Sequence, residues 1–393
     1  MTVDTMKQTP PSLRRAPAGI EPVRAGFIGT GNFVSGNHLP NAAQSKLWTI
    51  HGICDIDETN RTRAADRYKP TFVTTAYEEL LANDEIEVIF IGTRHQQHEK
   101  FICEAAAAGK DIFVEKPMSC TWDESRNMVE AVRAAGVRLM VGFNRRFSPA
   151  IQRAKTVYQA QNAGKPAMLT LRVVDDMRLW PDWPFDLADG GGKILAEACH
   201  FYDLACWFLE KEPCRIFACG GRSDNNVITL EFPDGSTACI ISSGWGSVAY
   251  PKELLEVFCD STTLVLEQHM TLHTDGYGPA QPATERFPLK QDAYPDLGAD
   301  DTIDGYRAKM RQYLTDGPTA EEHERKSYYE RIPSVEKGHF HELEAYATAI
   351  RAGQPSPCSE VDGARATAIA LKAIESLESR SVSVPIDGKD YFL

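Results

Sequence analysis

The chain has 393 residues, of which 42% are hydrophobic and 25% are charged, and its formal net charge is −13. This length predicts two domains, and the proportions are those of a soluble globular protein. An acidic chain repels nucleic-acid phosphates, and no apolar run approaches the length of a membrane span, so we expect no nucleic-acid partner and no membrane partner.

The N-terminal segment is polar and rich in proline, which predicts a flexible tail over residues 1–22. Arg14 and Arg15 are not followed by an apolar segment, so the tail is not expected to be an export signal. The ten cysteines are irregularly spaced and form no CxxC pair, which indicates free thiols in a reducing cytosol. We therefore expect a cytoplasmic protein whose acidic charge disfavours an anionic substrate, unless a local basic pocket overrides it.

Residues 23–143 alternate short apolar runs with segments of helical periodicity. The expected strands cover residues 23–29, 48–55, 86–93, 111–117 and 137–143, and the expected helices cover 60–68, 76–84, 97–110 and 121–136. Repeated β-α units of this kind predict a parallel sheet with helices on both faces. The sequence therefore predicts an α/β protein that begins with a Rossmann dinucleotide-binding domain.

The turn after the first strand carries a glycine pattern typical of dinucleotide-binding sites. In "FIGTGNFVSG", Gly29 allows the tight turn and Gly31 lets the backbone approach a pyrophosphate at the start of the next helix. The third position of the pattern is Val34 rather than glycine or alanine. Asp55 ends the second strand 24 residues after Gly31, where a carboxylate accepts hydrogen bonds from a ribose diol and repels a 2′-phosphate. The pattern therefore favours NAD over NADP, although Asp55 also suits a helix N-cap or a turn.

The second domain, residues 144–393, has a different pattern. A helix is expected over 148–164, followed by strands over 167–174, 215–221, 226–244 and 253–268, and then by two C-terminal helices over 339–353 and 363–379. Asp234-Gly235 marks a hairpin turn within these strands. Consecutive strands without intervening helices predict an α+β domain built on an open, mainly antiparallel sheet.

Residues 275–338 are polar, rich in proline and aromatic residues, and without a clean period. A segment of this length inside a compact domain usually has a functional or partner role. We expect an ordered arm that contacts a second subunit or lines the mouth of the active-site cleft, and disorder is the alternative. A homodimer or homotetramer built on the open sheet face, with the arm contributing, is the expected assembly.

The stretch "GGGKILAEACHFYDL", residues 190–204, places Glu197, His200 and Asp203 three residues apart. In one continuous helix these side chains share a face. Imidazole has a pKa suited to accepting a proton near neutral pH, and a neighbouring carboxylate holds the ring and stabilises its charged form. The alternatives are a core histidine and, for Asp203, a structural ion-pair partner.

Five motifs in order resemble the glucose–fructose oxidoreductase / inositol dehydrogenase / MocA family over nearly the whole chain from Val23. They are "IGTRHQQH" at 91–98, "EKPMS" at 115–119, "GFNRRFSP" at 142–149, the glycine-rich stretch at 190–204, and "GHFHELEAYATAIRAGQPSP" at 338–357. The resemblance implies a Rossmann domain followed by a domain with an open antiparallel sheet. It also implies hydride transfer from a secondary alcohol, on a sugar, glycoside or cyclitol, to NAD or, less expectedly, NADP.

The resemblance also implies roles for individual residues. His200 is the proton acceptor, Lys116 assists it, and Glu197 completes the catalytic set, because Ala196 stands where the family usually has an aspartate. The implied cofactor-binding residues are Gly29, Gly31, Asn32, Phe33, Asp55, Thr93, His95, His98, Glu115, Lys116, Asn144 and Arg146. The implied substrate-binding residues are Lys116, Trp183, Glu197 and His200. Trp180 and Trp183 suit stacking on a sugar ring or packing. No metal is expected, and a zinc site formed by His95, His98 and His200 is the disfavoured alternative.

Two other functions use the same architecture. Oxidation of a glycoside at one ring carbon acidifies its neighbour and permits elimination of the aglycone, with the cofactor recycled. A non-catalytic NAD-binding sensor is a further possibility, against which the presence of Lys116 and His200 argues. The sequence does not identify the sugar, the carbon that is oxidised or the physiological direction.

Overall fold

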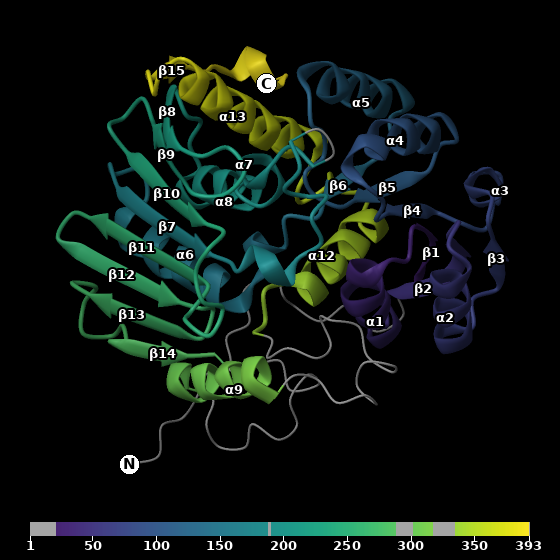
Figure 1. Cartoon of the computed structure of the whole chain (residues 1–393), viewed down its shortest axis with the longest axis horizontal. Coiled ribbons are helices and arrows are strands. Elements are labelled where there is room, and N and C mark those ends of the chain that lie inside the picture. Colours follow the sequence, from purple (N-terminus) through teal and green to yellow (C-terminus); the bar gives the residue numbers. More distant parts are fainter. Residues whose placement is uncertain (1–20, 188–189, 288–301, 317–334, 393) are drawn as a thin grey trace.

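A computed structural model describes residues 21–187, 190–287, 302–316 and 335–392. Figure 1 shows two sheets side by side, a parallel sheet in the N-terminal half and a larger sheet in the C-terminal half, with helices between and around them. In the part of the chain that the structure describes, no helix is long and apolar enough to cross a membrane.

The N-terminal sheet has six parallel strands in the order β3-β2-β1-β4-β5-β6. The strands are β1 Val23–Ile28, β2 Trp48–Cys54, β3 Phe72–Thr74, β4 Val88–Ile91, β5 Asp111–Val114 and β6 Leu139–Val141. The helices are α1 Leu39–Gln44, α2 Glu58–Tyr68, α3 Tyr77–Leu81, α4 His98–Ala107 and α5 Trp122–Ala135. The strand order reverses between β1 and β4, which is where Rossmann domains bind their ligands. The predicted fold class is confirmed.

The C-terminal sheet has nine strands in the order β14-β13-β12-β11-β7-β10-β9-β8-β15. They are β7 Met168–Val174, β8 Arg215–Gly220, β9 Asn226–Glu231, β10 Thr237–Ser243, β11 Glu253–Cys259, β12 Thr262–Glu267, β13 Thr271–Asp275, β14 Thr284–Arg286 and β15 Val384–Pro385. All neighbouring pairs are antiparallel except β7 and β10, which run parallel. The hairpin predicted at Asp234-Gly235 joins β9 to β10, and Gly235 has the positive φ of +87° that this turn needs.

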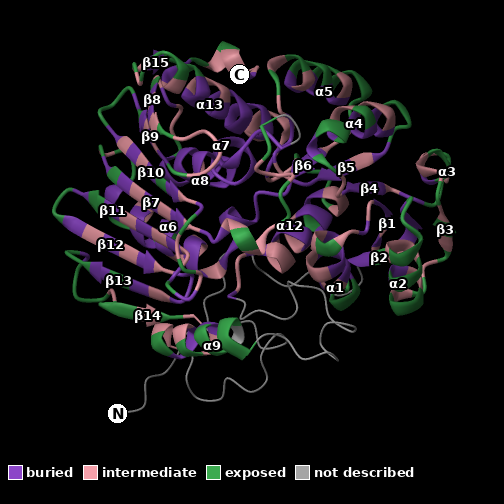
Figure 2. Cartoon of the chain, in the orientation of Figure 1, coloured by how far each residue is buried: buried purple, intermediate pink, exposed green. Residues whose placement is uncertain are grey.

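Helices cover one face of this sheet: α6 Pro149–Asn162 contacts β12, α8 Cys199–Leu209 contacts β10, and α13 Glu360–Glu378 contacts β8. Figure 2 shows α8 almost entirely in the colour of buried residues. The opposite face carries three large apolar side chains that are 39–54% exposed, Met168, Ile241 and Phe258. Met168 and Phe258 are directly opposite each other on β7 and β11. One face of the sheet is therefore packed and the other is open, as the pattern predicts.

The helices nearest the C-terminus pack against the Rossmann sheet. In α12, His339–Arg351, the Leu343 carbonyl accepts a hydrogen bond of 3.0 Å from Trp48 Nε1, and the Tyr346 hydroxyl donates one of 2.9 Å to the Ile112 carbonyl. On α13, a Cβ added at Gly363 would lie 2.6 Å from Met118 Sδ, so only glycine allows this approach. These contacts hold the two halves together and fix the cleft between them.

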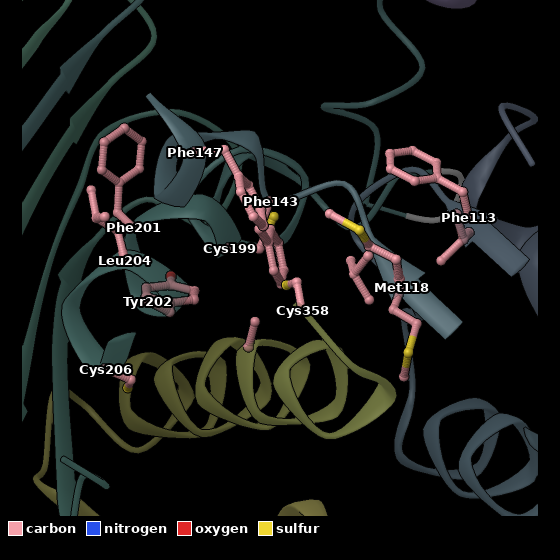
Figure 3. Close-up of a cluster of buried hydrophobic side chains, with 14 of the residues drawn as sticks. Phe113, Met118, Phe143, Phe147, Cys199, Phe201, Tyr202, Leu204, Cys206 and Cys358 are labelled. Carbon is pink, nitrogen blue, oxygen red and sulfur yellow. The ribbon is translucent and has the colours of Figure 1, made fainter. Parts of the chain in front are cut away.

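Figure 3 shows the apolar cluster at this junction, in which Phe143 and Cys199 lie above the α13 helix with Cys358 beside them. Phe143, Cys199 and Cys358 are each at most 1% exposed. Burial raises the pKa of the Cys199 thiol to about 12, so this cysteine is a protonated, apolar part of the core.

The segment over 275–338 contains two described elements, β14 and the helix α9, Ile303–Asp316. Figure 1 shows α9 beside the β14 edge of the sheet. Tyr306 and Met310 of α9 form a small apolar cluster with Val335, Ala249 and Met270, all at most 6% exposed. The described part of the arm is therefore ordered, while the tyrosine-rich stretch 324–333 lies outside the described residues. The short strand β15 was not predicted, because two residues carry no periodic signal.

Candidate functional site

A cleft of about 1160 Å³ runs from the carboxyl ends of the Rossmann strands to the edge of the second sheet. The predicted residues that line it are Gly29, Gly31, Asn32, Phe33, Asp55, Thr93, His95, Glu115, Lys116, Trp183, Glu197 and His200. The structure thus gathers residues from distant parts of the chain into one cavity.

The turn after β1 is shaped for close approach of a ligand. Gly29 has a φ of +83°, and a Cβ there would lie 3.0 Å from the Gly92 carbonyl oxygen. A Cβ at Gly31 would meet no atom within 4 Å, so this backbone faces open space in the cleft. Val34, at the third position of the pattern, packs onto Gly92, where an added Cβ would be 2.2 Å from Val34 Cγ2. Close packing between the helical segment after the turn and the sheet requires a small residue on one side. Here that residue is Gly92, directly after β4, instead of the residue at position 34.

Asp55 is 8% exposed and lies beside this turn at the end of β2. Its Oδ2 accepts hydrogen bonds from Thr30 N at 2.7 Å and Thr30 Oγ1 at 3.0 Å, and its Oδ1 accepts one from Asp57 N at 2.9 Å. These contacts hold the carboxylate at the cleft wall. A glycine cradle with no side chain in the way and a fixed carboxylate beside it fit the pyrophosphate and ribose of an adenine dinucleotide.

Lys116 lies two residues after β5 and extends into the cleft. Its Nζ donates hydrogen bonds to the Ala196 carbonyl at 2.8 Å and to Glu197 Oε2 at 3.2 Å. The side chain is thus held at both ends, by the rigid strand end and by the glycine-rich segment of the second domain. This arrangement aims a fixed ammonium group at the inside of the cleft.

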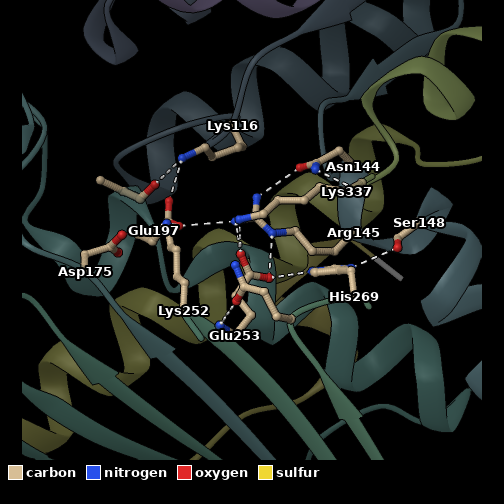
Figure 4. Close-up of polar contacts among 12 residues, drawn as sticks. Lys116, Asn144, Arg145, Ser148, Asp175, Glu197, Lys252, Glu253, His269 and Lys337 are labelled. Atoms are coloured by element: carbon tan, nitrogen blue, oxygen red, sulfur yellow. Dashed lines mark hydrogen bonds and ion pairs between the residues drawn. The ribbon is translucent and has the colours of Figure 1, made fainter. Parts of the chain in front are cut away.

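Glu197 is surrounded by three cations. Besides Lys116, its Oε1 accepts hydrogen bonds from Lys252 Nζ at 3.0 Å and from a terminal nitrogen of Arg145 at 3.3 Å. Figure 4 shows Glu197 between Lys116 and Arg145. Burial alone would raise the pKa of this carboxyl, but the charges of Lys252, Lys116 and Arg145 outweigh burial and lower its pKa well below the usual range. Glu197 is therefore an anion that holds cations, and not a general acid.

His200 is the second residue of α8, 2% exposed, and its ring meets Phe143 edge-on at 5.8 Å between centroids. Burial, Arg145 and Lys116 lower the pKa of His200 well below its usual value. Its Nδ1 has no hydrogen-bond partner among the described residues. The lowered pKa favours the neutral imidazole near pH 7, and His200 lines the cleft while its Nδ1 is buried.

The predicted acid–imidazole–acid stripe does not form on one helix. A short helix, α7 Lys193–Ala196, ends before Glu197, and α8 begins at Cys199, so Glu197 lies in the break between them. The Glu197 carboxylate contacts the three cations, and Asp203 forms a two-point ion pair with Arg146. The prediction that a carboxylate one turn away holds the imidazole is therefore wrong, because stronger cationic partners hold both carboxylates. The structural alternative for Asp203 is the observed one.

Below Glu197, a second carboxylate organises further cations. Glu253 accepts hydrogen bonds from Arg145 at 3.0 Å and Lys337 at 2.7 Å, and contacts His269 Nε2 at 3.0 Å. Burial would raise the pKa of Glu253, but Arg145 and Lys337 lower it well below its usual range. Figure 4 shows this network continuing to Asn144, which accepts a hydrogen bond of 3.0 Å from Arg145.

The structure places three predicted cofactor ligands, His98, Asn144 and Arg146, outside the residues that line the cleft. His98 is fully buried, with Nδ1 3.0 Å from the Pro117 carbonyl behind Lys116. Asn144 and Arg146 are at most 4% exposed and contact protein groups. These three residues support the site from behind, because His98 Nδ1, Asn144 and Arg146 contact neighbouring backbone and ion-pair partners, whereas His98 Nε2 has no hydrogen-bond partner among the described residues.

His95 lines the cleft, 3.3 Å from the Gly190 carbonyl through Nδ1, and its ring meets Trp183 edge-on at 4.8 Å. Burial, His98 and Lys116 lower the pKa of His95 well below its usual value. Within the described ranges, no group of three or more His, Cys, Asp or Glu side chains is placed to hold a metal ion.

Two apolar walls flank the polar floor of the cleft. One is the loop that carries Trp180 and Trp183, and the other is formed by Tyr306 and Met310 of α9. The described helix of the arm therefore lines the cleft. Lining the cleft mouth is one of the two roles expected for the arm, and contact with a second subunit is the other.

Three charged residues of the site, Asp175, Lys252 and Arg145, were not predicted from the sequence. Asp175 directly follows β7, and Lys252 directly precedes the antiparallel neighbour β11, so both lie at the same edge of the sheet. Lys252 Nζ is 2.7 Å from Asp175 Oδ1. Charged residues at the ends of two strands could have indicated a site. This indication depends on β7 and β11 being neighbours in the sheet, which the sequence alone does not show.

Comparison with known proteins identifies both halves of the chain. Residues 23–143 match a family model described as an oxidoreductase family with an NAD-binding Rossmann fold, and residues 151–265 match the GFO/IDH/MocA C-terminal domain. The chain belongs to the GFO/IDH/MocA oxidoreductase family. The resemblance predicted from the five motifs is thereby confirmed.

Among curated relatives of this family, the uncharacterized oxidoreductase YrbE of Bacillus subtilis is 29% identical over 90% of this chain and 93% of its own length. The trans-1,2-dihydrobenzene-1,2-diol dehydrogenase of Mus musculus is 33% identical over 58% of this chain and 71% of its own length. The solved structure of levoglucosan dehydrogenase with NADH and levoglucosan has a TM-score of 0.73 at 20% identity, covering 93% of this chain and 100% of that chain. This structural likeness shows the fold.

Proposed function

We propose that this oxidoreductase is an NAD-dependent dehydrogenase of a secondary hydroxyl on a sugar, glycoside or cyclitol. The observation that carries the proposal is the presence of Lys116, Glu197 and the neutral His200 in the same cleft as the glycine cradle. The retained lysine and histidine argue against the sensor alternative.

In this mechanism His200 accepts the proton that leaves the substrate hydroxyl, and the bound cofactor supplies the acceptor for the hydride that leaves the same carbon. Lys116 stabilises the negative charge that develops on the hydroxyl oxygen. Glu197 positions Lys116 through the 3.2 Å contact and stays ionised throughout. The apolar surroundings of His200, including Phe143, exclude water and keep the imidazole neutral until it accepts the proton.

The preference for NAD over NADP rests on Asp55. Its carboxylate is fixed at the cleft wall by Thr30 and Asp57, so it meets an adenosine ribose without rearrangement. A 2′-phosphate at the same place would meet a fixed negative charge.

Relatives and the apolar walls support the substrate class. The curated diol dehydrogenase and the levoglucosan complex both have names that specify ring alcohols. The walls formed by Trp180, Trp183, Tyr306 and Met310 would accept an apolar aglycone beside a sugar on the polar floor. This observation keeps redox-assisted glycoside cleavage as the second candidate.

We also propose that the protein is a homodimer or homotetramer built on the open sheet face. The exposed cross-strand pair Met168 and Phe258, with Ile241 four residues further along the same face on β10, supports this assembly. Exposed apolar side chains gathered on one face are a feature of protein–protein interaction sites.

The test is a screen of free sugars, inositols and glycosides with NAD, followed at 340 nm. A dehydrogenase produces an oxidised ring and NADH in equal amounts. Release of an aglycone without net NADH identifies the cleavage reaction instead. Binding of NAD without any turnover or aglycone release across the screen would contradict both.

A further inference from the structure

The floor of the cleft carries more positive than negative charge. Five cations and three carboxylates form one continuous ion-pair network among the described residues, which leaves a surplus of two positive charges. The cations are Lys116, Arg145, Lys193, Lys252 and Lys337, and the carboxylates are Asp175, Glu197 and Glu253. This basic cluster contrasts with the net charge of −13 for the whole chain.

Lys252 is the cation placed to meet a ligand. Its side chain is 12% exposed and lines the cleft, with Nζ 3.0 Å from Glu197 Oε1, 2.7 Å from Asp175 Oδ1 and 5.0 Å from the centroid of the Trp180 ring. Lys193, in contrast, is fully buried behind Asp175. Figure 4 shows Lys252 below Glu197, on the side away from Lys116. A ligand on the floor of the cleft would therefore contact two lysines, one on each side of Glu197.

The other charged groups near the network do not cancel the surplus. His269 adds no positive charge, because burial lowers its pKa. Glu115 lines the cleft but is held by His38 on the cofactor side, and counting it still leaves one surplus positive charge. Asp176 is paired with Arg178.

Behind the site, Arg146 and Arg365 pair with three carboxylates, Asp203, Asp362 and Glu212, in a separate group. The carboxylate in excess, Glu212, is 42% exposed and contacts Arg365 and Tyr391 and none of the five cations of the cleft floor.

An uncompensated charge in a buried network is costly. Lys337 lies in this environment: burial and the nearby charges of Lys252 and Arg145 lower its pKa despite its 2.7 Å contact with Glu253. A bound oxidised nicotinamide would add a further positive charge. An anionic group on the substrate would offset this cost.

We propose that the substrate carries a carboxylate, as in a uronic acid or another sugar acid, and that Lys252 is the residue that recognises it. This inference rests on the proposed function in one respect: the ligand is taken to be a ring with several hydroxyl groups. Lys116 and His200 serve the hydroxyl that is oxidised, and Lys252 holds the carboxylate through a charge-assisted hydrogen bond. The local basic pocket overrides the repulsion expected from the acidic chain.

The test compares matched pairs of ligands in the presence of NADH, by calorimetry: methyl β-D-glucuronide with methyl β-D-glucoside, and D-galacturonate with D-galactose. We expect the acid of at least one pair to bind about tenfold more tightly than its neutral partner or better. In Lys252→Gln, the affinities for the acid and for its neutral partner should differ by no more than about threefold. Lys252→Arg should retain the preference for the acid. Lys69→Gln, at a site 74% exposed on the Rossmann domain, is the matched control and should change nothing.

The inference would be overturned if the neutral ligands bound as tightly as the acids in both pairs. It would also be overturned if Lys252→Gln kept the preference for the acid. Tighter binding of D-glucose 6-phosphate than of both acids would replace the carboxylate by a phosphate. If Lys252→Gln does not fold by circular dichroism, Lys337→Gln provides the second removal of a cleft cation and should weaken the preference for the acid. Turnover is measured separately: binding of the acid without oxidation of any ring alcohol contradicts the proposed dehydrogenase and leaves the carboxylate site standing.

Discussion

Replacing Glu197 with glutamine removes the negative charge that three buried cations share. The ion-pair distances are 3.2 Å to Lys116, 3.0 Å to Lys252 and 3.3 Å to Arg145. At an effective dielectric constant of about 20, each contact is worth about 5 kcal/mol of attraction before desolvation. Lys252 keeps Asp175 and Arg145 keeps Glu253, but Lys116 loses its carboxylate partner, so the net loss in the free energy of unfolding should be about 3–5 kcal/mol.

The assay is urea denaturation at pH 7, followed by far-UV circular dichroism, with turnover measured on the same samples. Glu231→Gln is the matched control, because Glu231 pairs with Arg215 while both are 49% exposed, and its loss should cost less than about 1 kcal/mol. Glu197→Gln should also lower turnover, since Lys116 loses its side-chain anchor.

A second readout separates this positioning role from a purely structural one. The charge of Glu197 raises the pKa of His200, and the charge of Lys116 lowers it. The acid limb of the pH profile of kcat/KM should therefore move to lower pH in Glu197→Gln and to higher pH in Lys116→Met. A Glu197→Gln variant with wild-type stability, turnover and pH profile would refute the reasoning.

Three further predictions concern the cofactor, pH stability and assembly. The wild type should prefer NAD to NADP by at least about tenfold in kcat/KM, and Asp55→Asn should narrow that preference; equal use of both cofactors by the wild type would count against the assignment. Glu342 is fully buried, both its carboxylate oxygens lack a partner among the described residues, and burial together with Glu115 raises its pKa well above the usual value. Its protonated form is therefore favoured by folding, so the stability it contributes is complete below its unfolded pKa of about 4.3 and is lost as pH rises toward the folded pKa, by up to about 1.4 kcal/mol per pH unit. Glu342→Gln should raise the urea midpoint more at pH 8 than at pH 5, and an equal change at both values would contradict this. Phe258→Lys, on the open sheet face beside Met168, should reduce the mass measured by light scattering after size exclusion, whereas a wild-type monomer would refute the proposed assembly.

The fold followed from the sequence because local periodicity and turn chemistry agreed with the final arrangement. Strong local sequence patterns mark the parallel sheet, the hairpin at Asp234-Gly235, and the helices α5 and α13. One of these patterns is the capping box of Thr121 and Glu124 at the start of α5. The split between α7 and α8 at Glu197 did not follow, because tertiary ion pairs override the helical spacing there. β15 was too short to show a pattern.

Residues that the resemblance implies lie together in one cleft, but the ion-pair network beneath them did not follow from the sequence. Lys116 and His200 belong to motifs, so the resemblance identified them. Lys252 belongs to none of the five motifs, and Arg145 lies in one of them without a role assigned to it, so the contacts of both with Glu197 depend on the tertiary structure. Such long-range neighbours cannot be read from a single sequence without the order of the strands.

The central claim is that His200 accepts the proton of a secondary hydroxyl during hydride transfer to NAD. The most direct measurement is the turnover of His200→Ala at 340 nm, with the substrate found for the wild type and with folding checked by circular dichroism. Loss of acid–base catalysis predicts a fall in turnover of about 100-fold or more, with a smaller change in NAD affinity. A folded His200→Ala variant with near wild-type turnover would contradict the claim and make the histidine a structural residue.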